Sequence, residues 1–263
     1  MTAADLYYRI VSRVRHRFSA SNTLGHGIHS PYLYYLVRFL IYDDTPYYCF
    51  ADIERLRRRL LADERKIYVE DLGTGVSGER RISDIASSSL MPQKQAQMIF
   101  RLLNYLHPDT CLELGTNLGI TASYMSKAVG KNGKVFTFEG AKELIAVAKK
   151  NWQKLACENL TAVEGNIDLT LPQFLEKVET VDFAVVDANH TYEATMRYFS
   201  LLLEKCNAKS ILMFDDIHYS KQMNRAWQDI KNTESVTTTM DFCDFGLVFF
   251  DPQYMRKHFK LRF

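Results

Sequence analysis

The stretch LELGTNLG, residues 112–119, is the most informative part of the sequence. It starts as an apolar run typical of a buried strand, passes through a turn that contains Gly115 and Gly119, and continues into a helical pattern. Glycines in such a turn let the backbone approach a ligand closely, and the N-terminus of the following helix offers free N–H donors. The stretch therefore predicts a strand, a turn and a helix that together bind a cofactor. The alternative is a tight turn without a ligand.

Short apolar runs alternate with helical patterns on the C-terminal side of this stretch, which is typical of βαβ units and a mostly parallel sheet. The expected strands are residues 110–114, 134–139, 160–165, 181–187 and 210–216. Two further β-rich runs, 235–242 and 246–251, leave no room for a helix between them and indicate an antiparallel hairpin. Residues 1–65 have helical patterns instead. The expected fold class is α/β, a doubly wound Rossmann-like sheet with a C-terminal antiparallel hairpin and an N-terminal helical extension.

Composition excludes some classes of protein. The chain has 263 residues and a net charge of +2, which gives no electrostatic case for nucleic-acid binding. Its five cysteines include no CxxC pair and indicate a reducing compartment. The longest apolar segment, residues 31–42, is interrupted by Arg38 and is too short to cross a bilayer. We expect a cytoplasmic protein that binds neither nucleic acid nor membrane, with a homodimer as an open possibility.

The spacing of acidic residues around the glycine turn favours one cofactor over another. Glu139 ends the second expected strand, where a carboxylate can accept hydrogen bonds from both hydroxyls of a ribose. A dinucleotide site would prefer G-x-G-x-x-G, whereas this turn has E-x-G-x-x-x-G. Glu113 would repel a pyrophosphate but could hold a ligand's ammonium group, directly or through water. The pattern therefore favours S-adenosylmethionine over NAD.

On these residues the chain resembles the class I S-adenosylmethionine-dependent methyltransferases, and more closely their small-molecule O-methyltransferases of the catechol and caffeoyl-CoA type. The resemblance covers roughly residues 87–251. It implies a seven-stranded sheet closed by the hairpin, a helical extension or cap at 1–90, and a methyltransferase domain at 91–263. A stretch at 87–90 resembles the segment before the helix that closes over the cofactor in relatives.

The resemblance also implies a set of cofactor-binding residues. Glu113, Gly115 and Gly119 match the first cofactor motif, which also contains Thr116 and Asn117, and Glu139 matches the acid that binds ribose. The residues that match the loop along the adenine are Gly165, Asn166, Ile167 and Asp168, and Asp187 is added as a further cofactor-binding residue.

A second group of polar residues follows the fourth and fifth expected strands, in DANHTY (187–192) and DDIHY (215–219). The C-terminal ends of neighbouring parallel strands meet at one crevice, so Asp187, Asp215 and Asp216 are expected close together. A divalent cation such as Mg²⁺ would relieve their mutual repulsion. In the catechol type, two Asp and one Asn hold the metal, and Asp216 stands at the Asn position. The alternative is that Asp215 and Asp216 cap the helix expected near 219–230.

His190 lies three residues after Asp187, where catechol-type relatives carry the lysine that deprotonates the attacking hydroxyl. An imidazole can do the same work, so His190 is the candidate catalytic base, with Asp187 as a catalytic partner and His218 as a second candidate base. The alternative for His190 is a loop residue that faces solvent.

Two other stretches stand out. EDLGTGVSG, residues 70–78, looks like a nucleotide-binding glycine loop, but no second strand ending in an acid follows it, so we interpret it as a turn or lid. GHGIHSPYLYYLVRF, residues 25–39, predicts a helix that begins at Ser30 and Pro31. This helix belongs to a segment that we expect to cap the acceptor pocket or form a dimer surface.

The sequence therefore predicts transfer of the methyl group of S-adenosylmethionine to a hydroxyl of a small molecule, with Mg²⁺ as a candidate helper. Two alternatives stay open: an NAD(P)-dependent oxidoreductase, and a non-catalytic protein that binds S-adenosylmethionine. The sequence does not identify the acceptor.

Overall fold

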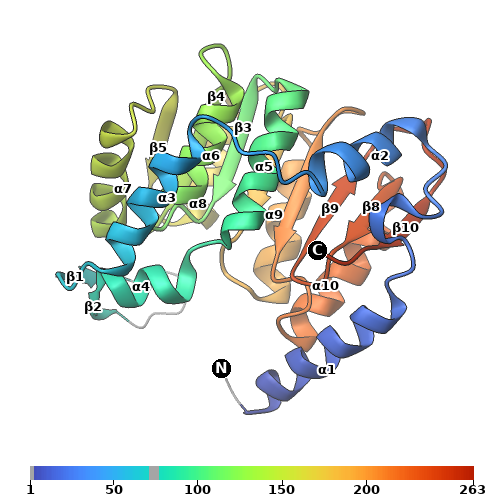
Figure 1. The fold of residues 1–263 in the computed structure, drawn as a ribbon, viewed down its shortest axis with the longest axis horizontal. Coiled ribbons are helices and arrows are strands. Elements are labelled where there is room, and N and C mark those ends of the chain that lie inside the picture. The colour runs from blue at the N-terminus through green and yellow to red at the C-terminus, as the bar shows by residue number, and fades with distance from the viewer. Residues whose placement is uncertain (1–2, 71–76) are drawn as a thin grey trace. The chain divides into compact units, whose positions relative to one another are not determined.

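The computed structural model describes residues 3–70 and 77–263. The chain forms two compact units, one that combines Met1–Tyr42 with Val178–Phe263 and another that consists of Asp43–Lys177. The division into a 1–90 extension and a 91–263 domain stays a prediction. Figure 1 shows the elements of both units as a ribbon.

The unit at Asp43–Lys177 contains the predicted glycine turn. Its three strands β3, β4 and β5 lie side by side in that order and pair in parallel, with Leu112 opposite Phe136. A separate antiparallel ladder joins β1 to β2. Its elements are α3 (Phe50–Leu61), β1 (Lys66–Val69), β2 (Gly78–Arg81), α4 (Ile82–Ser89), α5 (Gln93–Leu106), β3 (Thr110–Leu114), α6 (Ile120–Val129), β4 (Lys134–Glu139), α7 (Lys142–Lys154), β5 (Leu160–Glu164) and α8 (Ile167–Leu175).

The other unit holds both ends of the chain. Its strands lie in the order β10, β8, β9, β7, β6, with β6 and β7 parallel and β9 antiparallel to both β7 and β8. Its elements are α1 (Ala3–Ser19), η1 (Thr23–Gly25), α2 (Pro31–Leu36), the π-helical η2 (Val37–Ile41), β6 (Phe183–Val186), α9 (Tyr192–Leu203), β7 (Ile211–Asp215), α10 (Lys221–Asn232), β8 (Thr238–Asp241), β9 (Phe245–Phe249) and β10 (Lys257–Lys260).

These strands confirm the predicted fold class: an α/β Rossmann-like protein whose strands are mostly parallel, with antiparallel strands at the C-terminus and helices at the N-terminus. The short strand β10, which pairs in parallel with β8, lies beyond the predicted hairpin. No helix within residues 3–70 and 77–263 is both long enough and apolar enough to cross a membrane.

The ends of several helices follow from local sequence. Ser30 caps α2 with its side chain and Pro31 takes the first helical position, as predicted. Helix α10 is capped by Ser220, whose side chain accepts the N–H of Met223. The proposal that Asp215 and Asp216 cap this helix is therefore wrong, because the helix begins only at Lys221.

Candidate functional site

The turn after β3 has the backbone conformation that the glycines predict. Gly115 and Gly119 have φ angles of 105° and 78°, and Asn117 lies between them at 50°. The N–H groups of Gly115 and Thr116 both donate to the carbonyl of Phe138, at 3.0 and 3.1 Å. These two hydrogen bonds therefore hold the turn against β4. Gly119 immediately precedes the first residue of α6.

Gly119 has a packing role that the sequence analysis did not anticipate. A Cβ at this position would lie 2.5 Å from Nε1 of Trp152 and 2.9 Å from Cβ of Ala148. The indole N–H of Trp152 donates to the carbonyl of Gly119 at 3.0 Å. The absence of a side chain at this position therefore lets α6 begin directly against α7.

Glu139 is the last residue of β4, and its carboxylate organises the surrounding backbone. One oxygen accepts the N–H of Asn117 at 2.9 Å, and the other accepts the N–H of Ala141 at 3.0 Å. Each carboxylate oxygen has a second lone pair, so both can still accept a hydroxyl hydrogen. The geometry is compatible with the predicted ribose contact, which stays a prediction.

Glu113 is 1% exposed and is the buried acid of this site. Its carboxylate accepts a hydrogen bond from the hydroxyl of Thr137, which in turn lies 2.5 Å from the hydroxyl of Thr116. Burial raises the pKa of Glu113 to about 8. The hydrogen bond from Thr137 lowers this pKa, whereas the negative charge of Glu139 raises it further. A carboxyl group in this state is poised to ionise when a cationic ligand binds.

Asn117 contributes a further binding feature. Its side-chain N–H donates to the carbonyl of Ser89 at 3.2 Å, which ties the turn to the predicted closing segment. Its side-chain oxygen is buried and has no hydrogen-bond partner in the described structure. A buried acceptor without a donor is costly, so this oxygen is suited to a donor from a ligand.

The four residues predicted to lie along an adenine have local structural roles that the sequence analysis missed. Gly165 has a φ of 126°, and its N–H donates to the carbonyl of Glu139 at 2.9 Å. Asn166 caps α8 by accepting the N–H of Asp168 at 2.9 Å. Ile167 is buried. An Asn followed by an acid at the start of an apolar helical pattern is a recognisable capping signal.

The second group of predicted residues lies in the other unit, where β6 and β7 end side by side. Nε2 of His190 lies 3.5 Å from Oδ1 of Asp187 and 4.0 Å from Oδ2 of Asp216. Burial lowers the pKa of His190, and the negative charge of Asp216 opposes that shift. The predicted neighbourhood of Asp187, His190 and Asp216 is therefore present, with the imidazole beside both carboxylates.

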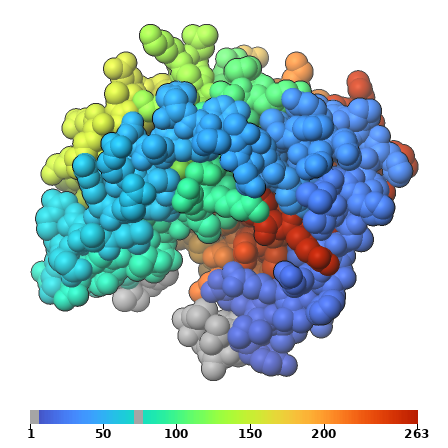
Figure 2. All heavy atoms as spheres, viewed as in Figure 1, coloured from blue at the N-terminus to red at the C-terminus, as the bar shows by residue number. Residues whose placement is uncertain are grey.

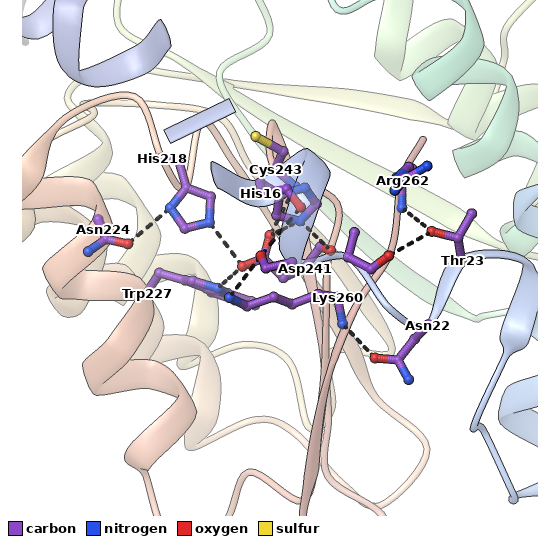
Figure 3. Close-up of polar contacts among 12 residues, drawn as sticks. His16, Asn22, Thr23, His218, Asn224, Trp227, Asp241, Cys243, Lys260 and Arg262 are labelled. Atoms are coloured by element: carbon purple, nitrogen blue, oxygen red, sulfur yellow. Dashed lines mark hydrogen bonds and ion pairs between the residues drawn. The ribbon is translucent and has the colours of Figure 1, made fainter. Parts of the chain in front are cut away.

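His218, the second candidate base, is already engaged (Figure 3). Its Nε2 lies 2.9 Å from Oδ2 of Asp241, and its Nδ1 lies 3.0 Å from the side-chain oxygen of Asn224. The indole N–H of Trp227 donates to the same carboxylate oxygen at 3.1 Å. With both ring nitrogens in hydrogen bonds, His218 is less suited than His190 to accept a proton from an acceptor.

Comparisons with known proteins agree with this arrangement. A family profile described as "Methyltransferase domain" matches residues 112–217. The fold is similar to that of the O-methyltransferase TomG from Streptomyces achromogenes in complex with SAM, with a TM-score of 0.58, 14% identity, and coverage of 78% of this chain and 91% of that chain. Residues 112–217 thus match a methyltransferase domain, and the chain shares the fold of O-methyltransferases of known structure. The O-methyltransferase from Bacillus cereus in complex with SAH gives a similar match, with a TM-score of 0.57, 14% identity, and coverage of 78% and 91%.

The chain also matches curated relatives. It is 35% identical over 72 residues to the protein-L-isoaspartate O-methyltransferase of Methanococcoides burtonii, a stretch that covers 27% of this chain and 36% of that protein. The chain thus spans about a third of the length of the first curated relatives that it matches. The methyltransferase-domain match over residues 112–217 gives no support to the NAD(P)-dependent alternative.

The expected metal site is not assembled among the described residues. Asp215, the last residue of β7, does not join Asp187 and Asp216 in a group that could bind a metal ion. No group of three or more His, Cys, Asp or Glu side chains within residues 3–70 and 77–263 is placed to do so. His190 lies within 4.0 Å of two of the three carboxylates.

The structure describes the glycine-rich stretch at 70–78 only in part. Residues 71–76 lie outside the described residues, and Gly78 begins β2. Strand β1 precedes the stretch, and the sequence analysis did not predict β2. The interpretation of 70–78 as a turn or lid stays a prediction.

Proposed function

We propose that this methyltransferase transfers the methyl group of S-adenosylmethionine to a hydroxyl of a small molecule, with His190 as the catalytic base. The arrangement of His190 beside Asp187 and Asp216 carries the proposal. A lowered pKa keeps the imidazole neutral near pH 7, so it can accept a proton. The two carboxylates would then stabilise the imidazolium that forms.

The residues of the glycine turn support the cofactor assignment. S-adenosylmethionine, when bound, supplies a methyl carbon activated by a positively charged sulfur. The buried carboxyl of Glu113 and the unpartnered oxygen of Asn117 suit a ligand that brings positive charge and N–H donors. Glu139 would accept the ribose hydroxyls while it keeps its backbone contacts. Gly165 through Asp168 would border the adenine.

The protein has few chemical tasks in this reaction. The cofactor, held by Glu113, Asn117 and Glu139, would supply the methyl group, and the acceptor hydroxyl would have to lose its proton. The hydroxyl proton passes to Nε2 of His190. No covalent enzyme intermediate is needed, so positioning and deprotonation are the main contributions of the protein.

The proposal assigns no step to a metal ion. Asp187, Asp215 and Asp216 remain the residues to test for Mg²⁺, but their arrangement does not fit a three-ligand site. Activity that persists in EDTA and does not rise with added Mg²⁺ would agree with a metal-free reaction. A strict requirement for Mg²⁺ would restore the three carboxylates as ligands.

A second candidate acceptor is the carboxyl group of an isoaspartyl residue, which the partial match to a protein-L-isoaspartate O-methyltransferase suggests. A carboxylate is already ionised at neutral pH, so its methylation does not need a base. The two candidates therefore differ in whether the reaction depends on His190.

Methyl transfer from radiolabelled S-adenosylmethionine tests both candidates, with a panel of phenols and other small hydroxyl compounds and with an isoaspartyl peptide. We expect His190→Ala to lower turnover on the hydroxyl acceptor by roughly 10² to 10⁴ without changing the affinity for S-adenosylhomocysteine. His29→Ala, which removes an exposed histidine of the same unit, is the matched control. Full activity of His190→Ala on a hydroxyl acceptor would overturn the assignment of the base. Binding of S-adenosylhomocysteine without turnover would favour the non-catalytic alternative.

A further inference from the structure

Helix α1 is attached to its unit through polar side chains. Nε2 of His16 lies 3.0 Å from a carboxylate oxygen of Asp241, and both side chains are buried (Figure 3). Arg13 pairs with Asp244 at 2.8 Å. The guanidinium of Arg9 lies over the ring of Tyr219, 4.7 Å from its centroid. The side of α1 that faces the protein is therefore the side with histidine and arginine.

The apolar side of α1 faces outward. Tyr7 is 71% exposed, Ile10 55%, Val14 52% and Phe18 85%. Steps of three, four and four residues place these side chains in one stripe along the helix. In Figure 2, α1 lies at the surface in the deepest blue. An amphipathic surface helix normally packs its apolar stripe against the core. Helix α1 has the opposite orientation, with its apolar stripe toward solvent.

Positive charge borders this stripe. At about 100° per residue, Arg15 projects on one side of the stripe and Arg17 on the other, and both are exposed. Residues 7–19 contain four arginines and no aspartate or glutamate. An outward apolar stripe with an arginine on each side is the pattern of a helix that lies in the interface of an anionic bilayer.

A second copy of the chain fits the stripe less well. A two-fold contact through α1 would bring the arginines of one copy toward those of the other, and like charges at an interface are unfavourable. Four side chains also fall short of the roughly 20 residues per partner that a standard interface uses. The charge of the helix thus favours a negatively charged lipid surface as its occupant.

We propose that α1 binds the surface of membranes rich in anionic phospholipid. Tyr7, Ile10, Val14 and Phe18 enter the boundary between headgroups and acyl chains, while Arg15 and Arg17 contact the phosphates. The expectation of no membrane partner was based on the absence of a segment that could span a bilayer. That argument does not apply to a helix that lies parallel to the membrane surface. This proposal does not depend on methyl transfer, so the membrane proposal and the proposed function can each be wrong without affecting the other.

Flotation of the full-length protein with phosphatidylcholine vesicles, with and without phosphatidylglycerol, tests the proposal. We expect binding only to the vesicles that contain phosphatidylglycerol, and weaker binding as salt rises. Ile10→Ser combined with Phe18→Ser should weaken binding at least tenfold, and Arg15→Gln combined with Arg17→Gln should also weaken it. Leu169→Ser is the matched control, because Leu169 is an apolar residue of the other unit whose exposed fraction lies between those of Ile10 and Phe18.

Three results would overturn the proposal. The first is no binding to either vesicle, and the second is binding that the stripe substitutions leave unchanged. The third is a lipid-free dimer, seen by sedimentation, that the stripe substitutions dissociate, because the stripe would then be covered by a second copy. All variants alter exposed side chains, so a near-wild-type melting temperature should show that each is folded.

Discussion

At the scale of single residues, Glu113 shows how burial prepares a charged group for a ligand. The sequence places a carboxylate beside the glycine turn, and the structure adds that this carboxyl is 1% exposed with a pKa raised to about 8. The acid therefore stays protonated near neutral pH until a cationic group approaches. We expect the binding of a cationic cofactor to release a proton, which makes Glu113 the link between cofactor affinity and pH.

Glu113→Gln should stabilise the protein without ligand at alkaline pH and weaken binding of S-adenosylhomocysteine by roughly 10-fold or more. The folded pKa of about 8 lies above the value of about 4.3 expected in the unfolded chain, so wild-type stability falls as pH rises between these values. The variant lacks this loss, and its advantage should be absent at acid pH and largest above about pH 8. Melting curves across this range, with and without S-adenosylhomocysteine, measure both effects. The same pH dependence in both proteins would contradict the raised pKa.

At this scale, the sequence predicts which residues of the candidate site lie close together, but not how their side chains are oriented. Asp187, His190 and Asp216 lie together as expected, because they follow two neighbouring parallel strands. Which way each side chain points depends on backbone angles such as the φ of 54° at Asp216, which no residue pattern specifies. The expected three-carboxylate metal site depended on those orientations. The capping role of Asn166 was accessible to sequence reasoning and was overlooked.

At the scale of elements, the strands were the most predictable feature. The observed bounds of β3 and β4, Thr110–Leu114 and Lys134–Glu139, equal the expected ones, because buried strands have continuous apolar runs between turn residues. Strand β10 was missed because Lys257–Lys260 is mostly charged and exposed, and it is a strand through its pairing with β8. The periodicity of α1 could not reveal which of its sides would be covered.

The contact between α6 and α7 gives a test at the scale of elements. Gly119→Ala places a Cβ 2.5 Å from Nε1 of Trp152 at a φ of 78°, so it combines overpacking with backbone strain. We expect the free energy of unfolding to fall by about 2 to 4 kcal/mol, as measured by urea denaturation. Gly78→Ala is the matched control, since a Cβ there meets nothing within 4 Å. Equal stability of the two variants would mean that α7 moves away without cost.

At the scale of the whole chain, Asp241 joins its two ends. Its carboxylate lies 3.0 Å from Nε2 of His16 and 2.9 Å from Nε2 of His218, and it also accepts the N–H of Cys243 at 2.9 Å. Burial would raise the pKa of Asp241, but the hydrogen bonds from the two histidines outweigh it and hold the pKa well below its usual range. Nearby, the side chain of Asn22 accepts the N–H of Lys260 (Figure 3), so the N-terminal segment is joined to the last strand as well.

Asp241→Asn should therefore lower the free energy of unfolding by about 3 kcal/mol near neutral pH, because it leaves the buried His16 and the partly buried His218 without their anion. The folded pKa of Asp241 is lowered, so its contribution is present above the unfolded value of about 3.9 and is lost as pH falls below it. The gap between variant and wild type should consequently stay constant from about pH 7 to about pH 5 and shrink as pH falls below about 4, as measured by urea denaturation across this range. Asp244→Asn, which removes an exposed partner of Arg13 in the same hairpin, should cost no more than about 1 kcal/mol. If the two variants are equally stable, or if the gap does not change with pH, then α1 is held by its packing and not by the buried charge of Asp241.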